Sequence, residues 1–66
     1  MKYVYFVSHI YCEGYLTKWA NCESYYDKAI SDIDDIKTIA DNIAKCNGYK
    51  QSPTILSFKL LRIEQE

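Results

Sequence analysis

One amphipathic segment, SDIDDIKTIADNIAKCNG, constrains the fold of this chain more than any other feature. Ser31 is placed to cap the start of a helix, and Asn47-Gly48 supplies the left-handed stop at its end. The pattern therefore predicts a helix over residues 32–46 that buries one side against the rest of the chain. Apolar side chains recur there at helical spacing and form a single stripe: Ile33, Ile36, Ile39, Ala40 and Ile43.

Three runs rich in strand-forming residues surround this helix. They cover residues 2–11, 15–25 and 54–63, and the last follows Pro53, which suits the start of a strand. A chain of 66 residues holds one domain. Because the helix crosses back after the hairpin, the last strand is expected beside the first. The sequence predicts an α+β fold, a single ββαβ domain whose three-stranded antiparallel sheet has the order 2-1-3, with the helix packed on one face.

The turn between the first two strands decides which side chains share a face, because a slip by one residue reverses every side chain of the second strand. A three-residue loop, Cys12-Glu13-Gly14, needs positive φ only at Gly14 and pairs Tyr11 with Tyr15. With this register the face expected under the helix is aliphatic: Val4, Phe6, Ser8, Ile10, Leu16, Ala20 and Cys22. The face expected to stay open is aromatic: Tyr3, Tyr5, Val7, His9, Tyr11, Tyr15, Thr17, Trp19, Asn21 and Glu23.

Such an aromatic face would be a larger apolar patch than a small monomer normally exposes. Tyrosine and tryptophan are also enriched at binding hot spots. We therefore expect a partner on this face, either a second copy that makes a homodimer or a foreign protein; a homodimer would stabilise so small a chain. The alternative is an ordinary sheet whose tyrosines lie flat in solvent. The residues expected to bind are Tyr3, Tyr5, His9, Tyr11, Tyr15 and Trp19.

Two other kinds of ligand stay open for the same face. One is a small ligand or nucleotide held between dimer-related aromatic faces in a homo-oligomer. The other is single-stranded nucleic acid, whose bases stack on aromatic sheets. Lys2 and Lys18 give the second alternative little support, because nucleic-acid binding rests on lysine and arginine contacts with phosphates. Nucleic acid is therefore an unfavoured partner.

Acidic side chains concentrate in one part of the chain. The net charge is −1, yet residues 23–41 hold six acidic side chains and two lysines. One interpretation is a solvated helix face whose acids favour the helix N-terminus. The other is that Asp32, Asp34 and Asp35 match a basic surface on a partner protein, where complementary charge gives orientation and a fast association rate.

The sequence contains no pattern typical of catalysis or of cofactor binding. The three cysteines include no CxxC pair, which disfavours a zinc site. His9 and Cys22 fall on opposite faces of the predicted sheet, so they do not form a thiol–base pair. Asp34 and Asp35 diverge by about 100° around a helix and do not form a carboxylate dyad. We expect no enzymatic activity, no cofactor and no metal.

Three features favour the cytosol. An odd number of cysteines is typical of a reducing compartment. The opening MKYVYF runs directly into a strand pattern, so no secretory leader is expected. The longest apolar run is far shorter than a membrane span. The expected location is cytoplasmic, without membrane contact.

The motifs YFVS in the first strand, NCES in the second and ISDIDDIKTIADNIA at the helix resemble a group of small uncharacterised proteins. Phages and prophages of low-GC Gram-positive bacteria encode this group. Its recurring pattern is roughly YFVSY, then GNCE, then D-P-I-x-S-I-x-D-I-x-x-I, then a last strand like ILNFKLL. Ala29 stands where the group often has proline, and the first turn is shorter here.

The resemblance covers nearly the whole chain, and its motifs are structural rather than catalytic. It implies a compact, non-enzymatic phage protein. Proteins of that kind often block a host defence such as a CRISPR effector, either by binding the effector or by sequestering its signal. The resemblance thus implies a stoichiometric inhibitor that binds a host protein or protein complex in the host cytosol.

Overall fold

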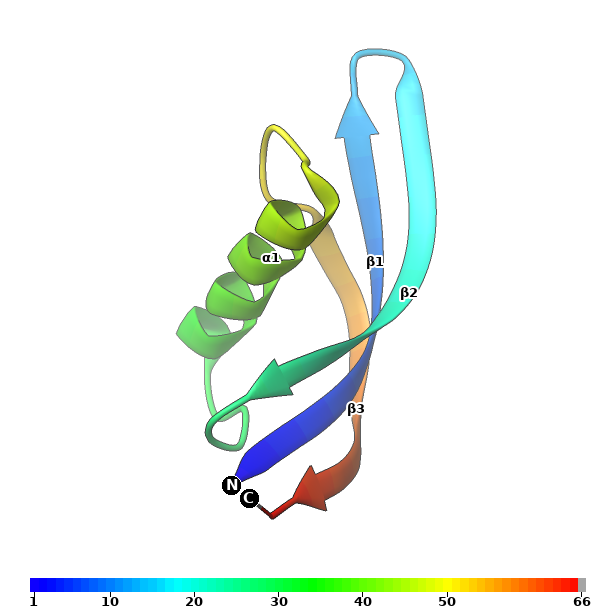
Figure 1. Cartoon of the computed structure of the whole chain (residues 1–66). Coiled ribbons are helices and arrows are strands. Elements are labelled where there is room, and N and C mark those ends of the chain that lie inside the picture. Colours follow the sequence, from blue (N-terminus) through cyan, green and yellow to red (C-terminus); the bar gives the residue numbers. More distant parts are fainter. Residues whose placement is uncertain (66) are drawn as a thin grey trace.

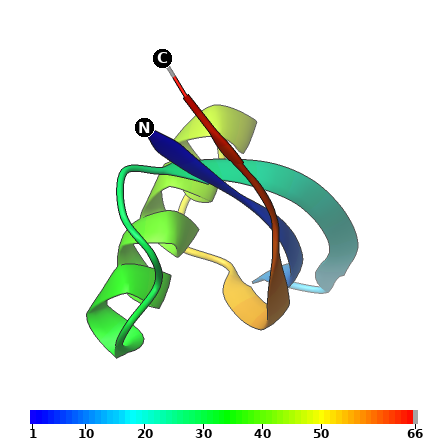
Figure 2. The ribbon, with the colours of Figure 1, turned by 90° about the horizontal axis from the view of Figure 1, so that it is seen from below.

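The computed structural model describes residues 1–65, which form three strands and one helix (Figure 1). Their order is β1 (Lys2–Glu13), β2 (Leu16–Tyr26), α1 (Ile33–Asn47) and β3 (Thr54–Glu64). The strands form an antiparallel sheet of order β2-β1-β3, and α1 lies on one side of the curved sheet (Figure 2). The predicted α+β class, ββαβ order and strand order are confirmed. Each element begins and ends within two residues of its predicted bounds.

The hairpin between β1 and β2 has a shorter loop than predicted. Glu13 pairs with Leu16, so Gly14 and Tyr15 alone form the turn, and Gly14 has φ +59°. Glycine with positive φ at the first loop position is the requirement of a type II′ turn. Tyr11 therefore pairs with Lys18 rather than with Tyr15. The register differs from the predicted one by an odd number of residues, which reverses the face of every side chain on β2.

The helix covers the aromatic side of β1, not its aliphatic side. Tyr5 and Val7 form the core cluster with Ile39 and Ile43 of α1. Tyr3, Tyr26 and the half-buried Cys22 pack against this cluster, together with Ile30, Tyr49 and Ile55. The expectation that Val4, Phe6, Ser8 and Ile10 lie beneath the helix is wrong. From here on, the face under α1 is the helix-side face and the opposite one is the outer face.

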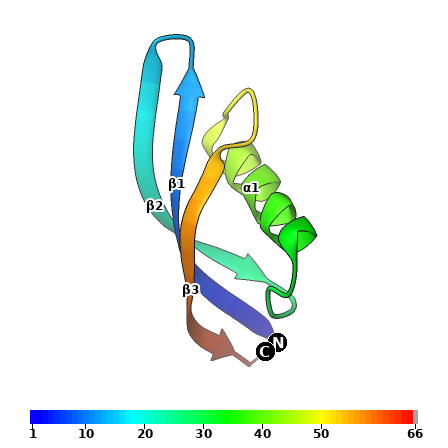
Figure 3. The same ribbon diagram turned by 180° about the vertical axis from the view of Figure 1, so that it is seen from behind.

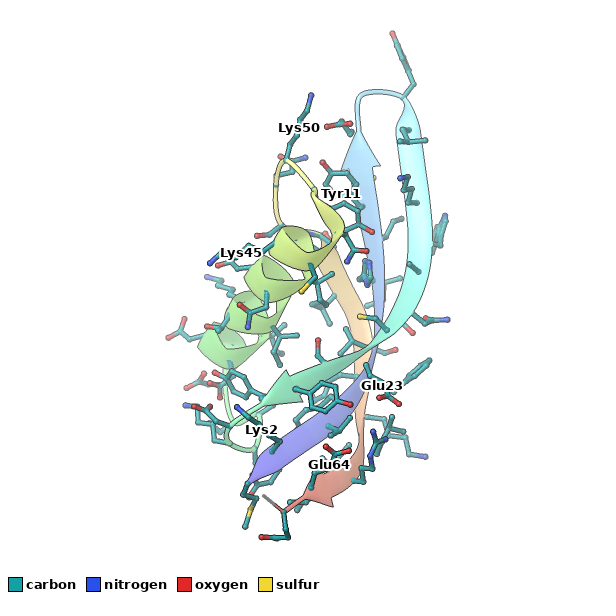
Figure 4. All side chains as sticks on the ribbon, in the orientation of Figure 1. Lys2, Tyr11, Glu23, Lys45, Lys50 and Glu64 are labelled. Atoms are coloured by element: carbon teal, nitrogen blue, oxygen red, sulfur yellow. The ribbon has the colours of Figure 1, made fainter. Side chains whose placement is uncertain are left out.

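Tyrosines suit this core because their rings fill it while their hydroxyl groups reach the loops at its rim. The Tyr5 hydroxyl accepts a hydrogen bond from the Ile30 N–H at 2.8 Å. The Tyr11 hydroxyl accepts one from the Lys50 N–H at 2.9 Å, and Figure 4 shows Tyr11 pointing from β1 toward the loop that carries Lys50. Buried Tyr hydroxyls usually find such partners. The tyrosines thus anchor the chain on both sides of α1.

The helix ends are formed largely as the sequence predicts, with one change at the start. Asp32, not Ser31, is the N-cap, and its carboxylate accepts a hydrogen bond from the Asp35 N–H at 3.1 Å. Gly48 ends α1 with φ +70°, as expected. Ile39 and Ile43 are buried, but Ile33 is 61% exposed because it lies in the first turn, beyond the core.

The outer face has a small cluster of its own. Val4 is fully buried there, with Tyr25 and Arg62 as its neighbours on the two flanking strands. The Arg62 guanidinium donates to the Glu23 carboxylate at 3.2 Å and to the Glu64 carboxylate at 2.9 Å. Long side chains from β2 and β3 thereby close the outer face over Val4.

The strands are much longer than the helix. The molecule measures 41 × 19 × 19 Å. Strands of 11 or 12 residues span close to that length, whereas a helix of 15 residues spans roughly 22 Å. The tip of the β1–β2 hairpin extends past α1 in Figure 1, and the sheet also continues past its other end. Much of the sheet therefore has no layer above it.

Candidate protein-binding surface

The predicted aromatic binding face does not exist as an open surface. Tyr5, His9 and Tyr11 are buried under α1, with at most 5% of each exposed, and Tyr3 is half-buried. Their role as partner contacts is therefore corrected to one in the core.

The other two aromatic residues of that set remain accessible. Tyr15 is fully exposed at the hairpin turn, and Trp19 is 71% exposed. Trp19 pairs with Ile10, so it lies on the outer face, opposite the tyrosines with which it was grouped. The two-residue turn thus separates the tryptophan from the tyrosine cluster.

The three acidic residues predicted to contact a partner differ in their exposure. Asp32 and Asp34 are exposed, whereas Asp35 is buried and bonded within the protein. The Asp35 carboxylate accepts hydrogen bonds from the Tyr26 hydroxyl at 2.7 Å and from the Ser31 N–H at 2.9 Å, and it pairs with the Lys28 ammonium at 3.0 Å. The bond from the Ser31 backbone, together with those from Tyr26 and Lys28, holds the pKa of Asp35 well below its usual range. Asp35 joins β2 to the helix start, and it is not a partner contact.

His9 belongs to a second buried polar group, near the end of the helix. Its Nε2 lies 3.3 Å from the Tyr49 hydroxyl, and the Tyr49 ring stacks on Tyr11 with ring centres 4.0 Å apart. The other ring nitrogen, Nδ1, is buried and has no hydrogen-bond partner among the described residues. Burial lowers the pKa of His9, so the ring is neutral near pH 7. This arrangement suits a packed core position.

An exposed apolar surface runs along β3. Phe58, Leu60 and Ile63 lie opposite Val7, Tyr5 and Tyr3, which places them on the helix-side face. Leu56 and Leu61 are the extra residues at two β-bulges. All five side chains are between 42% and 51% exposed. We call this set the β3 surface: Leu56, Phe58, Leu60, Leu61 and Ile63.

The β3 surface is open because α1 does not extend over it. Ile55 is the one β3 residue that packs against the core cluster among the described residues, and the Phe58 ring makes an edge-to-face contact with the Tyr5 ring. Figure 3, seen from behind, shows β3 in front of the sheet, with α1 to one side. Exposed apolar patches of this kind commonly mark protein-binding sites on small proteins.

Sequence reasoning missed the β3 surface although its pattern is present. TILSFKLLRI contains six apolar residues, but the sequence reasoning predicted only a strand over residues 54–63 and assigned its side chains to neither face. The size of the predicted helix could have revealed it, because a single helix of four turns is too small to cover both outer strands of a sheet.

The described residues show no other obvious chemistry. Cys12, Cys22 and Cys46 carry free thiols, and burial raises the pKa of the Cys22 thiol. Within residues 1–65, no three His, Cys, Asp or Glu side chains gather closely enough to hold a metal ion. Nor does this part of the chain contain a helix with the length and apolar character needed to cross a membrane.

No known protein family, curated protein or solved structure matches the chain.

Proposed function

We propose that the protein acts without catalysis, as a stoichiometric inhibitor that binds a host protein through the β3 surface. The observation that carries this proposal is the row of five half-exposed apolar side chains on β3. Two bulges interrupt the regular hydrogen-bonding pattern of β3, so side-chain packing rather than strand addition would supply the affinity. The exposed Asp32 and Asp34 remain candidates for matching a basic partner surface.

The kind of target comes from the sequence resemblance to phage and prophage proteins. It supports a host defence complex, of the CRISPR type, in the bacterial cytosol. The earlier alternatives, a small-ligand module and a single-strand binder, both depended on an open tyrosine face. The structure gives neither alternative a binding surface, because α1 covers the tyrosines of β1.

A plaque assay tests the inhibitor proposal. A Gram-positive host with active CRISPR immunity is challenged with a phage that its spacers match, with and without expression of the protein. Protection of the phage is expected, and Leu56→Asp should abolish it. The matched control is Leu16→Asp, because Leu16 is 48% exposed and Leu56 51%, but Leu16 lies at the hairpin, away from β3. An equal loss for both variants, or no protection by the original chain, would contradict the proposal.

A homodimer is the second candidate. The same apolar row is self-complementary in character, and burying it would stabilise a chain of this size. Light scattering gives the mass directly. A dimer that Leu56→Asp converts to a monomer would assign the β3 surface to a second copy, whereas a monomer at all concentrations would leave it to a foreign partner.

A further inference from the structure

A groove lies on the opposite edge of the sheet, between β2 and the second half of α1. The groove has a volume of about 270 Å³ and is lined by residues 22–25 of β2 and by Asn42, Ile43, Cys46 and Asn47 of α1. Consecutive residues of a strand point to opposite faces. A cavity that touches four of them in a row therefore opens on the backbone edge of the strand. In Figure 1, β2 passes in front of β1 and β3, with α1 beside it.

The edge of β2 is suited to pairing with another strand. β2 is an outer strand, and its eleven residues pair with β1 in one unbroken register, without a bulge. Its sequence contains neither proline nor glycine, so two of the devices that commonly block an edge, bulges and prolines, are missing from it. The outward backbone groups of β2 have no partner strand within residues 1–65. They are therefore free to bind one.

The cavity beside this edge suits one apolar side chain. Its volume lies just below the roughly 300 to 1,000 Å³ typical of sites for whole small molecules. Ile43 and the thiol of Cys22 supply apolar walls, and burial raises the pKa of that thiol. The Asn42 side chain at the rim is exposed and offers a polar contact to a neighbouring main chain. A strand edge beside such a cavity matches the way domains bind extended peptides.

From this geometry we infer that the groove binds an extended peptide segment of a partner protein, which adds as a fourth strand to β2 and inserts an apolar side chain between β2 and α1. This site is separate from the β3 surface and does not rest on the inhibitor proposal. A second copy of the chain fits the groove less well. Two-fold pairing of β2 with itself puts both helices on the same face, beside the joined edges, so they compete for the space that the groove provides.

A display library of random linear dodecapeptides, selected against the purified protein, tests the inference. Enriched peptides are synthesised, and their affinity is measured by fluorescence polarisation. Cys46→Phe, which fills the cavity from an exposed helix position, should weaken binding at least about tenfold. Its matched control is Cys12→Phe at the exposed end of β1, which should change affinity less than twofold. Asn42→Phe is a second filling variant if Cys46→Phe does not fold.

Methylation of single backbone amides along the best peptide tests strand addition itself. Because every second N–H of an added strand points to β2, affinity should fall at alternate positions only. The inference would be overturned if no peptide were enriched, or if Cys46→Phe bound the peptides as tightly as the original chain. Methylation effects that do not alternate along the peptide would also overturn it. It would also be overturned if the chain proved to be a dimer that Cys46→Phe converts to a monomer. Leu56→Asp should leave peptide affinity unchanged, which keeps this result independent of the β3 surface.

Discussion

Removing one hydroxyl group, in Tyr5→Phe, tests whether the tyrosines of β1 lie under the helix. The Tyr5 hydroxyl is the acceptor for the Ile30 N–H, at 2.8 Å, in the loop before α1. Phenylalanine keeps the ring but leaves that N–H without a partner, which costs about 1 to 3 kcal/mol. A domain of 66 residues has a free energy of unfolding of roughly 3 to 10 kcal/mol. The change therefore removes a large share of the stability.

Urea unfolding followed by circular dichroism at the helix band gives the measurement. The midpoint should fall with the slope unchanged, and the melting temperature should drop by roughly 4 to 8 °C for each kcal/mol lost. Tyr25→Phe is the matched control, because Tyr25 is 51% exposed on the outer face. Removing its hydroxyl group should lower the free energy of unfolding by less than about 0.5 kcal/mol. If Tyr25→Phe destabilises as much as Tyr5→Phe, the placement of the aromatic face under α1 is wrong.

Three further predictions concern the helix and two buried titratable side chains. Ile39→Ala should cost about 2 to 5 kcal/mol in urea unfolding, and Ile33→Ala less than about 1 kcal/mol, because only the first is buried; equal costs would contradict the helix orientation. The pKa of Asp35 is lowered on folding, so its contribution to stability is present above about pH 3.8 and is lost as the pH falls below that value. Asp35→Asn should therefore lower the urea midpoint at pH 7 and flatten its acid dependence, whereas Asp34→Asn should not. Burial lowers the pKa of His9, so stability should decline as the pH falls below about 6.5, where the unfolded chain takes up the proton first; a His9→Gln variant that keeps this decline would assign it to another group.

The elements and their order could be predicted because local signals agree for each of them. The helix that carries the isoleucine stripe ends at Gly48, where a left-handed conformation stops it. Pro53 comes directly before β3. In a chain this short, the order strand, strand, helix, strand allows few sheet topologies. The helix carries the chain from β2 back across the sheet to β3 beside β1, which gives the strand order β2-β1-β3.

The candidate site could not be predicted in the same way, because it depended on one turn. The sequence allows both a three-residue loop ending at Gly14 and a two-residue loop starting there. The two loops put Trp19 on opposite faces. Sequence reasoning also placed the tyrosines on the open face. It could not foresee that the backbone N–H groups of Ile30 and Lys50, in the loops on either side of α1, donate hydrogen bonds to the Tyr5 and Tyr11 hydroxyl groups in the folded chain.

The amino-acid sequence alone determined which segments are strands and helix, since spacing and end signals act within a few residues. Tertiary structure alone decided which side of β1 meets the helix and which apolar side chains stay exposed on β3. Those outcomes depend on the register at Gly14 and on how far a helix of 15 residues reaches across a long, twisted sheet, and both are set by contacts between distant parts of the chain.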